Sequence, residues 1–463
     1  MSSTLKYTSL EEIAFAHELV HKTFKAGTTR PLEWRKQQLR QLARMLRENE
    51  DAIVAALQAD MKKPALETIS FEINPMAERS FASAEMLDQW AQPERVEDVP
   101  DWQKSWAPTI HKAPKGPALI IAPWNFPVHL LFEPLIGALA AGCTAVIKPS
   151  EVAPHNAALM AELVPKYLDH SAVRVVNGSV PETTRLLELK WAHIFYTGNS
   201  KVARIVSAAA AKHLTPMTLE LGGKSPVVID GAHTDIALAA KRILWGKMNN
   251  AGQVCVAPDY ILVDRAHQDA FVASLEEAYR DFYPDGALGK VSYADIVSQS
   301  HYDRLLKLLK ETHAKKAFGG KVDGHRGIEP TVFTNVAADD ALLEGEIFGP
   351  LLPVVPYDTL QDAVDFINER PNPLSLYVFT DDQDVKQTFV DNTLSGGLIF
   401  NDTFTQLYVG NLPFSGVGES GNGSQHMKYT FDTFVHNRAS IDIPPEAEAI
   451  LGARYPALAA ASA

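Results

Sequence analysis

The chain has 463 residues, more than one hydrophobic core normally serves, so two or three packed domains are expected. Its formal charge of -13 disfavours a nucleic-acid-binding role, and no apolar stretch approaches the roughly 18 residues that cross a bilayer. Two cysteines and no CxxC or HExxH motif argue against a disulfide framework and a structural metal, and a start without a secretory leader predicts a cytoplasmic protein.

Residues 10–90 are predicted to be mainly helical. Apolar residues recur at three- and four-residue spacing, which indicates helices over residues 10–27, 31–61 and 71–90. Prolines and charges then replace this periodicity over residues 91–116. That segment is either a connecting loop or an arm that packs on another domain or subunit.

The remainder of the chain alternates short apolar runs with helical runs, as the βαβ units of a parallel sheet do. Strands are expected over residues 118–123, 144–149, 172–178 and 192–198. A second alternation follows, with a helix over residues 235–252 and strands over residues 260–263, 375–380 and 397–402. The sequence therefore predicts an α/β fold: a Rossmann-like nucleotide-binding domain, a second α/β domain and a cleft between them.

Two turns in the first α/β half have features of a nucleotide site. Gly198 lies between a strand and a helix, where free N–H groups and the positive end of the helix favour a pyrophosphate. Lys148 ends an earlier strand and Glu151 follows it, so this pair can donate to and accept from a ribose diol. Taken singly, these features also fit a plain turn and a surface ion pair.

Three further residues have the chemistry of a reaction centre. Asn125, held between aromatics and prolines in APWNFPV, is suited to donate to an oxyanion, although it also fits a turn. Glu220 ends an apolar run, where burial would raise its carboxyl pKa toward that of a general base, although it also fits a loop acid. Cys255 follows Gly252 among small residues that leave room for a substrate carbon, whereas Cys143 lies in an apolar run.

These residues belong to the motifs PWNFP, KPSE, FYTGNSKV, LELGGKSP, NAGQVCVAP, EIFGP and PFSGVGESG. Their order and separations resemble those of the NAD(P)-dependent aldehyde dehydrogenases, from about residue 15 to residue 438. The pairing of LELGGK with the later cysteine is a highly specific part of this likeness. AAAKHLTPMTLELGGKSP, NPLSLYVF and FDTFVHNR are more similar to the class 3, fatty-aldehyde branch than to the longer tetrameric classes.

The resemblance implies a role for each motif residue. Cys255 would be the nucleophile, Glu220 the general base, and Asn125 with the backbone N–H of Cys255 the oxyanion hole. Phe126 and Trp245 fall where the related branch lines its substrate tunnel. The cofactor NAD, with NADP as an alternative, would lie against Lys148, Glu151, Gly198, Asn199, Leu221, Glu346 and Phe348.

The chain departs from the family pattern at three positions. Asn199 stands where many members have serine and Ala203 where they usually have a second glycine, which leaves the detail of pyrophosphate binding open. Ser415 replaces a common glycine. Glu151 should repel a 2′-phosphate and so favours NAD, although the related branch often accepts both cofactors.

The resemblance also implies a division of the chain. An NAD(P)-binding domain is expected from residues 1–90 and 111–221, and a catalytic domain from residues 222–398. Residues 91–110 and 399–463 would form a small β arm for oligomerisation. A homodimer is the expected assembly, a tetramer is the alternative, and neither nucleic acid nor an integral membrane segment is expected.

The expected reaction oxidises a hydrophobic aliphatic or aromatic aldehyde to the carboxylic acid, through a cysteine thiohemiacetal and thioester. One alternative is an enzyme that passes the thioester to coenzyme A, but Glu220 argues against it because a hydrolytic base serves only when water is the acceptor. A second alternative is a catalytically silent scaffold, against which the joint presence of Cys255, Glu220 and Asn125 argues. The identity of the aldehyde is left open.

Overall fold

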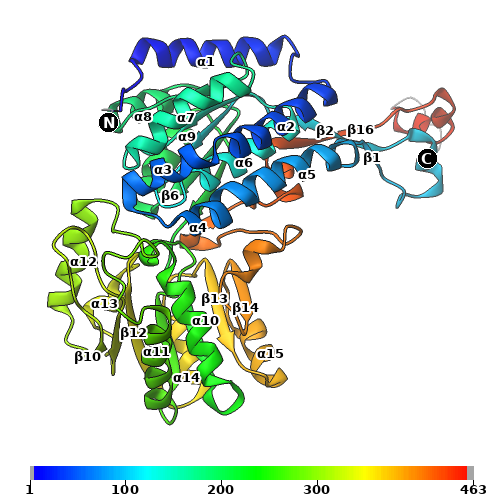
Figure 1. Cartoon of the computed structure of the whole chain (residues 1–463). Coiled ribbons are helices and arrows are strands. Elements are labelled where there is room, and N and C mark those ends of the chain that lie inside the picture. Colours follow the sequence, from blue (N-terminus) through cyan, green and yellow to red (C-terminus); the bar gives the residue numbers. More distant parts are fainter. Residues whose placement is uncertain (1–4, 456–463) are drawn as a thin grey trace.

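The computed structural model describes residues 5–455 and arranges them in two α/β bodies and an arm (Figure 1). The first body is built on a six-stranded sheet and the second on a seven-stranded sheet. The arm is a three-stranded sheet that projects from the first body (Figure 1). The α/β class predicted from the alternating pattern is confirmed.

The sheet of the first body contains β3 (Ala118–Ile121), β4 (Ala145–Lys148), β5 (Val173–Val175), β6 (His193–Gly198), β7 (Met217–Leu221) and β15 (Gly421–Asn422). Its order is β15-β7-β6-β3-β4-β5, with β3 to β7 parallel and β15 antiparallel to β7. Strand β3 is apolar at every position because both of its faces are buried. Ala118 and Ile120 lie in one apolar cluster, and Leu119 and Ile121 in another.

The first body has nine α-helices from the N-terminal half of the described chain: α1 (Leu10–Lys25), α2 (Leu32–Glu48), α3 (Glu50–Met61), α4 (Ala65–Thr68), α5 (Asn74–Trp90), α6 (His129–Ala141), α7 (Pro154–Tyr167), α8 (Val180–Glu188) and α9 (Ser200–Ala211). The prediction of one helix over residues 31–61 is wrong, because Asn49 leaves the helical conformation (φ -118°, ψ 23°) and separates α2 from α3. The stretch that precedes α5 is a π-helical turn, Ile69–Ile73, a distortion that is frequent at functional sites.

The sheet of the second body contains β8 (Pro226–Ile229), β9 (Tyr260–Asp264), β10 (Lys315–Phe318), β11 (Thr331–Thr334), β12 (Leu351–Tyr357), β13 (Ser375–Phe379) and β14 (Gly397–Phe400). Its order is β10-β11-β12-β9-β8-β13-β14, and only β10 runs antiparallel to its neighbour.

The helices of the second body are α10 (Ile236–Met248), α11 (Gln268–Phe282), α12 (Gln299–Glu311), α13 (Ala341–Glu344), α14 (Leu360–Asn368) and α15 (Gln383–Asn392). The helix expected over residues 235–252 ends at Met248, because Asn249 leaves the helical conformation (φ -54°, ψ 131°). Asn250 and Ala251 then take left-handed backbone conformations (φ 48° and 51°). Across residues 5–455, no helix combines the length and the apolar character needed to span a membrane.

The arm combines residues from two distant parts of the chain. Strand β2 (Thr109–Pro114) pairs with β1 (Glu94–Arg95) on one side and with β16 (Val435–Ser440) on the other. Trp102 and Trp106 pack edge to face in the intervening loop, with ring centres 5.0 Å apart. Residues 91–116 therefore contribute two strands to a projecting sheet and are not only a connecting loop. Packing of this arm on another subunit stays a prediction.

The chain between the second body and the arm returns to the first body. Strand β15 pairs with β7, and α16 (Lys428–Phe434) packs against α6. Phe431 and Phe434 are completely buried in the same apolar cluster as Ala118 and Ile120 of β3. Part of the range 399–463, expected as an oligomerisation segment, thus also completes the first body.

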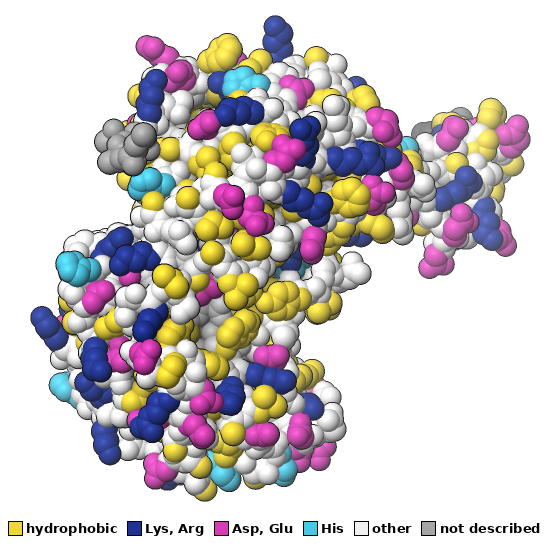
Figure 2. Space-filling view, in the orientation of Figure 1, with side chains coloured by type: hydrophobic (Ala, Val, Ile, Leu, Met, Phe, Trp, Pro, Cys, Tyr) yellow, Lys and Arg dark blue, Asp and Glu magenta, His cyan; other side chains and the backbone are white. Residues whose placement is uncertain are grey.

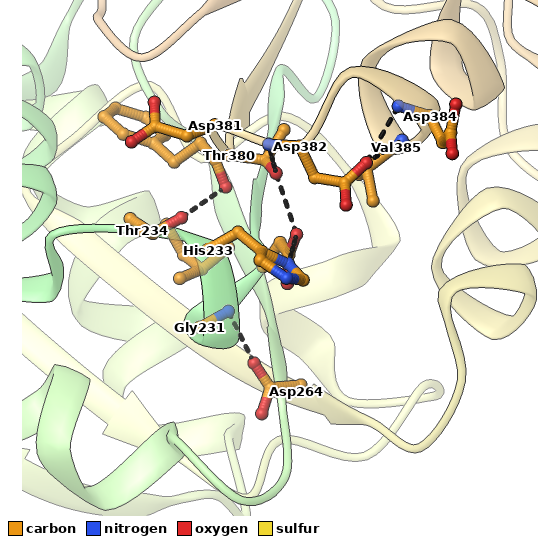
Figure 3. Close-up of polar contacts among 12 residues, drawn as sticks. Gly231, His233, Thr234, Asp264, Thr380, Asp381, Asp382, Asp384 and Val385 are labelled. Atoms are coloured by element: carbon orange, nitrogen blue, oxygen red, sulfur yellow. Dashed lines mark hydrogen bonds and ion pairs between the residues drawn. The ribbon is translucent and has the colours of Figure 1, made fainter.

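Polar contacts join the carboxyl ends of the parallel strands in the second sheet (Figure 3). The Asp264 carboxylate accepts from the Gly231 N–H (2.8 Å), and the Thr380 hydroxyl donates to Asp230 (2.8 Å). Asp382 accepts from the Asp384 and Val385 N–H groups in the first turn of α15 and so caps that helix. These contacts hold loops against the carboxyl ends of the strands. Cys255 precedes β9 and therefore lies at the amino end of that strand, the end away from these contacts.

Candidate active site

Two cavities lie between the bodies and meet at Cys255. The first, of about 590 Å³, is lined largely by aromatic and aliphatic side chains and is here named the apolar cavity. The second, of about 640 Å³, lies at the carboxyl ends of β4, β6 and β7 and is named the sheet-edge cavity. Figure 2 shows apolar side chains gathered at the waist between the two bodies. The residues that line both cavities are Leu130, Cys255, Phe414 and Gln425.

The loop before Cys255 has a strained backbone. Asn250, Ala251 and Gly252 are three successive residues with positive φ (48°, 51° and 74°). A Cβ atom on Gly252 would lie 2.3 Å from the Gly349 carbonyl oxygen, so only glycine fits this close approach. Strain of this kind persists where surrounding contacts fix the chain, and it gives Cys255 a defined position.

The Asn125 side chain reaches the same loop from the first body. It is only 3% exposed, and its Nδ2 donates to the Gln253 carbonyl oxygen at 3.2 Å. Asn125 also lines the sheet-edge cavity together with Cys255. The structure therefore brings the predicted amide donor and the predicted nucleophile into one site, although they are far apart in sequence.

Glu220 lies in β7, where it is 2% exposed and lines the sheet-edge cavity. Within residues 5–455, neither carboxylate oxygen has a hydrogen-bond partner. Burial without a compensating donor raises the pKa of Glu220 well above its ordinary value. A carboxylate in this setting binds a proton readily, as a general base must.

Burial also raises the pKa of the Cys255 thiol to about 12, and the carboxyl groups of Glu346 and Glu220 add to the shift. Glu346 is itself affected, since burial and Asp259 raise its pKa to about 8. Negative charge on the sulfur is thus unfavourable while both carboxyl groups are ionised. Because burial is the largest cause of the shift, a positive charge that enters the cavity would favour the thiolate.

The sheet-edge cavity contains every residue expected to bind the cofactor. Lys148 ends β4 and its Nζ lies 3.1 Å from Glu151 Oε2. Gly198 ends β6, and Asn199 caps α9 by accepting from the Val202 N–H at 2.9 Å. The Asn199 side chain is therefore occupied by its own helix, which is the local effect of this departure from the family pattern.

These features fit a dinucleotide. The cationic Lys148, the acceptor Glu151 and the N-terminus of the twelve-residue helix α9 offer partners for a ribose and a pyrophosphate. The Glu346 side chain occupies the space beside Gly222 where another residue would have its side chain. A Cβ atom at this position would lie 2.1 Å from Glu346 Oε2. Leu221 and Phe348 line the same cavity.

Phe126 and Trp245 occupy different places around the apolar cavity. Phe126 lines the cavity directly. Trp245 does not line it and instead packs behind two residues that do, Phe71 (ring centres 6.2 Å apart) and Phe404 (5.6 Å). Its influence on a bound molecule would pass through those two rings.

Two further lining residues, Trp124 and Arg79, are not among the residues predicted from the sequence. Trp124 packs edge to face on Phe348 in the sheet-edge cavity, with ring centres 5.3 Å apart. Arg79 lines the apolar cavity with its guanidinium 2.9 Å from Glu133. Trp124 belongs to the motif PWNFP, which is a signal for it in the sequence, whereas Arg79 lies on a helix without a motif. In the described part of the chain, no three potential metal ligands are grouped to hold an ion.

Comparison with known proteins finds a matching family and similar relatives. The model of the aldehyde dehydrogenase family matches residues 2–439. Aldehyde dehydrogenase family 3 member A2 of Mus musculus is 42% identical over 440 residues, which cover 94% of this chain and 90% of that protein. The dimeric NADP-preferring aldehyde dehydrogenase of Canis lupus familiaris is 40% identical over 448 residues, 96% of this chain and 98% of that one.

A solved structure shows the same fold. The structure titled as the substrate-bound state of Staphylococcus aureus AldH has a TM-score of 0.91 and 39% sequence identity. The match covers 94% of each chain.

Proposed function

The chain belongs to the aldehyde dehydrogenase family and oxidises aldehydes to carboxylic acids with NAD(P)+, and on that basis we propose that Cys255, Glu220 and Asn125 perform the chemistry. The observation that carries this proposal is the position of Cys255, which lines both cavities where they meet. An aldehyde in the apolar cavity and a nicotinamide in the sheet-edge cavity would both face its sulfur.

The proposed steps use the residues of this chain as follows. The Cys255 thiol loses its proton to solvent, its sulfur forms a bond to the aldehyde carbon, and the carbonyl electrons move to oxygen. The Asn125 amide and the Cys255 N–H donate to that oxygen. One such donor is worth about 3 kcal/mol in comparable sites. When bound, the oxidised nicotinamide supplies the acceptor for the hydride that the substrate carbon loses. Glu220 then takes a proton from water, which attacks the thioester and releases the acid as the carbon–sulfur bond breaks.

We propose that the substrate is a hydrophobic aliphatic or aromatic aldehyde. Phe71, Phe126, Leu130 and Phe404 line the apolar cavity, so an apolar chain would exchange water for aromatic surface there.

Catalytic efficiency is expected to rise with the length of a straight-chain aldehyde. Each added methylene contributes about 0.8 kcal/mol when buried, or about fourfold in kcat/KM, until the cavity is filled. The measurement is kcat/KM for a series from acetaldehyde upward with benzaldehyde included. Efficiency that stays flat, or that is highest for a small polar aldehyde, would contradict a hydrophobic substrate.

We propose NAD as the preferred cofactor, with NADP also used. Glu151 lies beside Lys148 in the sheet-edge cavity and would repel a 2′-phosphate on the adenosine ribose. The related dog enzyme named above is NADP-preferring, so the charge at this position needs a direct test.

Glu151→Gln is expected to raise kcat/KM for NADP relative to NAD by about tenfold, which corresponds to about 1.4 kcal/mol of removed repulsion. A matched control is Glu162→Gln, which removes an exposed carboxylate of α7 that pairs with Lys166. An unchanged cofactor ratio in Glu151→Gln would show that this carboxylate does not select the cofactor.

We propose that residues 1–90 and 111–221 form the cofactor-binding domain and residues 222–398 the catalytic domain.

We also propose a homodimer assembled through the arm. Strand β16 pairs with β2 alone and β14 with β13 alone among residues 5–455, so each leaves an edge able to accept another strand. A relative carries the word dimeric in its name.

We propose that the protein works in the cytoplasm, because a free nucleophilic thiol stays reduced in a reducing compartment.

A further inference from the structure

A buried ion pair lies directly behind the Asn125 peptide. Lys63 follows α3 and Glu72 lies in the π-helical turn, and both side chains are completely buried. The Lys63 ammonium donates to a Glu72 carboxylate oxygen and, at 2.9 Å, to the Asn125 carbonyl oxygen. It also lies 3.7 Å from the ring centre of Phe126. Neither Lys63 nor Glu72 lines either cavity.

The other oxygen of Glu72 holds the far end of the same segment. It accepts from the Val128 N–H at 2.8 Å and from the His129 N–H at 3.4 Å, where α6 begins. The carboxylate therefore satisfies donors of the first helical turn and complements the positive end of α6. Together, Lys63 and Glu72 fix the backbone from Asn125 to His129 at both ends.

The second body contributes another donor to the same carbonyl. Asn250 Nδ2 donates to the Asn125 carbonyl oxygen at 3.0 Å, and the Asn250 N–H donates to Glu67 at 2.8 Å. Asn250 is one of the residues with positive φ in the loop before Cys255. The Asn125 carbonyl oxygen thus accepts from both bodies, while the Asn125 side chain donates to Gln253 in that loop.

We propose that Lys63 and Glu72 are positioning residues that hold the Asn125 amide in line with the developing oxyanion. Both acceptor directions of the Asn125 carbonyl are filled, which fixes its peptide plane and hence the direction of its side chain. A buried ion pair is by itself weak evidence for stability, because desolvation offsets the attraction. The contact with Asn125 gives this pair a second role. The inference rests on the proposed function of Asn125.

Lys63→Met is expected to lower kcat by about 10- to 100-fold, while KM for the aldehyde and Kd for the dinucleotide change less than about threefold, because an oxyanion donor acts in the transition state. Arg35→Met is the matched control. Arg35 is also a buried cation that donates to backbone carbonyls, at the other end of α6, where it contacts Ala140 (3.2 Å). The control is expected to lower Tm without lowering kcat.

The deciding experiment is a double-mutant cycle of Lys63→Met with Asn125→Ala, read as kcat for a single aldehyde. If Lys63 acts through the Asn125 amide, adding Lys63→Met to Asn125→Ala lowers kcat by less than about threefold. Losses that multiply would overturn the positioning role and leave the proposed function intact. Wild-type kcat in Asn125→Ala alone would instead remove the proposed oxyanion donor, and the inference with it.

If the single Lys63→Met variant does not fold, Lys63→Met with Glu72→Gln takes its place in the cycle, since removal of both charges leaves no uncompensated ion in the core. This neutral pair still lacks the donor to the Asn125 carbonyl, so the same loss in kcat is expected. A folded neutral-pair variant with wild-type kcat would overturn the inference.

Discussion

Cys255→Ala is expected to abolish aldehyde oxidation, with a loss of at least about 10⁴-fold in kcat, and to leave dinucleotide affinity within about twofold. The sulfur is the one group that lines both cavities and can form a bond to the aldehyde carbon. Alanine removes that bond-forming atom and little volume. Formation of the reduced dinucleotide measures the first quantity, and titration of the dinucleotide measures the second.

The chain offers its own control for this variant. Cys143 is the second cysteine, 1% exposed, and its thiol donates to the Phe434 carbonyl oxygen at 3.4 Å. Burial raises the pKa of Cys143 to about 11, and Cys143 lines neither cavity. Cys143→Ala is therefore expected to keep wild-type kcat. Substantial turnover by Cys255→Ala would refute the assignment of the nucleophile.

Glu220→Gln is expected to slow the steady state by about 10²- to 10³-fold while the first turnover remains fast. An amide cannot accept the proton of the attacking water, so the thioester forms and then persists. A rapid-mixing experiment should show a burst of one reduced dinucleotide per site, followed by slow turnover.

The pH profile supplies a second readout of the same variant. Burial holds the pKa of Glu220 well above its ordinary value, and the base acts when deprotonated. Wild-type kcat should therefore rise as pH increases through that raised pKa, and Glu220→Gln should lose this rise. Wild-type turnover without a burst would point to another base. Formation of acyl-coenzyme A by the wild type would favour the acylating alternative.

The first α/β body was predictable because its strands are short, apolar and bounded by turns. Strand β3 is apolar at consecutive positions, as a strand buried on both faces is, and turn residues bound it. The break at Asn49 was missed because Leu46 and Ile53 are seven residues apart, a spacing that keeps both on one helical face across the polar residues 47–51. The return of β15 to the first sheet was missed because a two-residue strand has no periodicity to detect.

The proposed reacting residues were predictable as candidates because they lie in motifs, and the structure places Asn125, Glu220 and Cys255 around one cavity. Lys63 was not predictable. A lysine after a helix usually faces solvent, and its contact with the Asn125 carbonyl depends on the packing of segments that are distant in sequence. Trp245 packs behind the residues that line the apolar cavity. The position of a residue in the sequence does not show whether it lines the cavity or packs behind the lining.

The most direct test of the account is the mass of Glu220→Gln after it is mixed with an aldehyde and the oxidised dinucleotide and quenched in acid. The account predicts that the peptide containing Cys255 gains the mass of one acyl group, and that the peptide containing Cys143 gains none. Absence of an acyl group on Cys255 while the reduced dinucleotide accumulates, or an acyl group on another residue, would contradict covalent catalysis by this thiol.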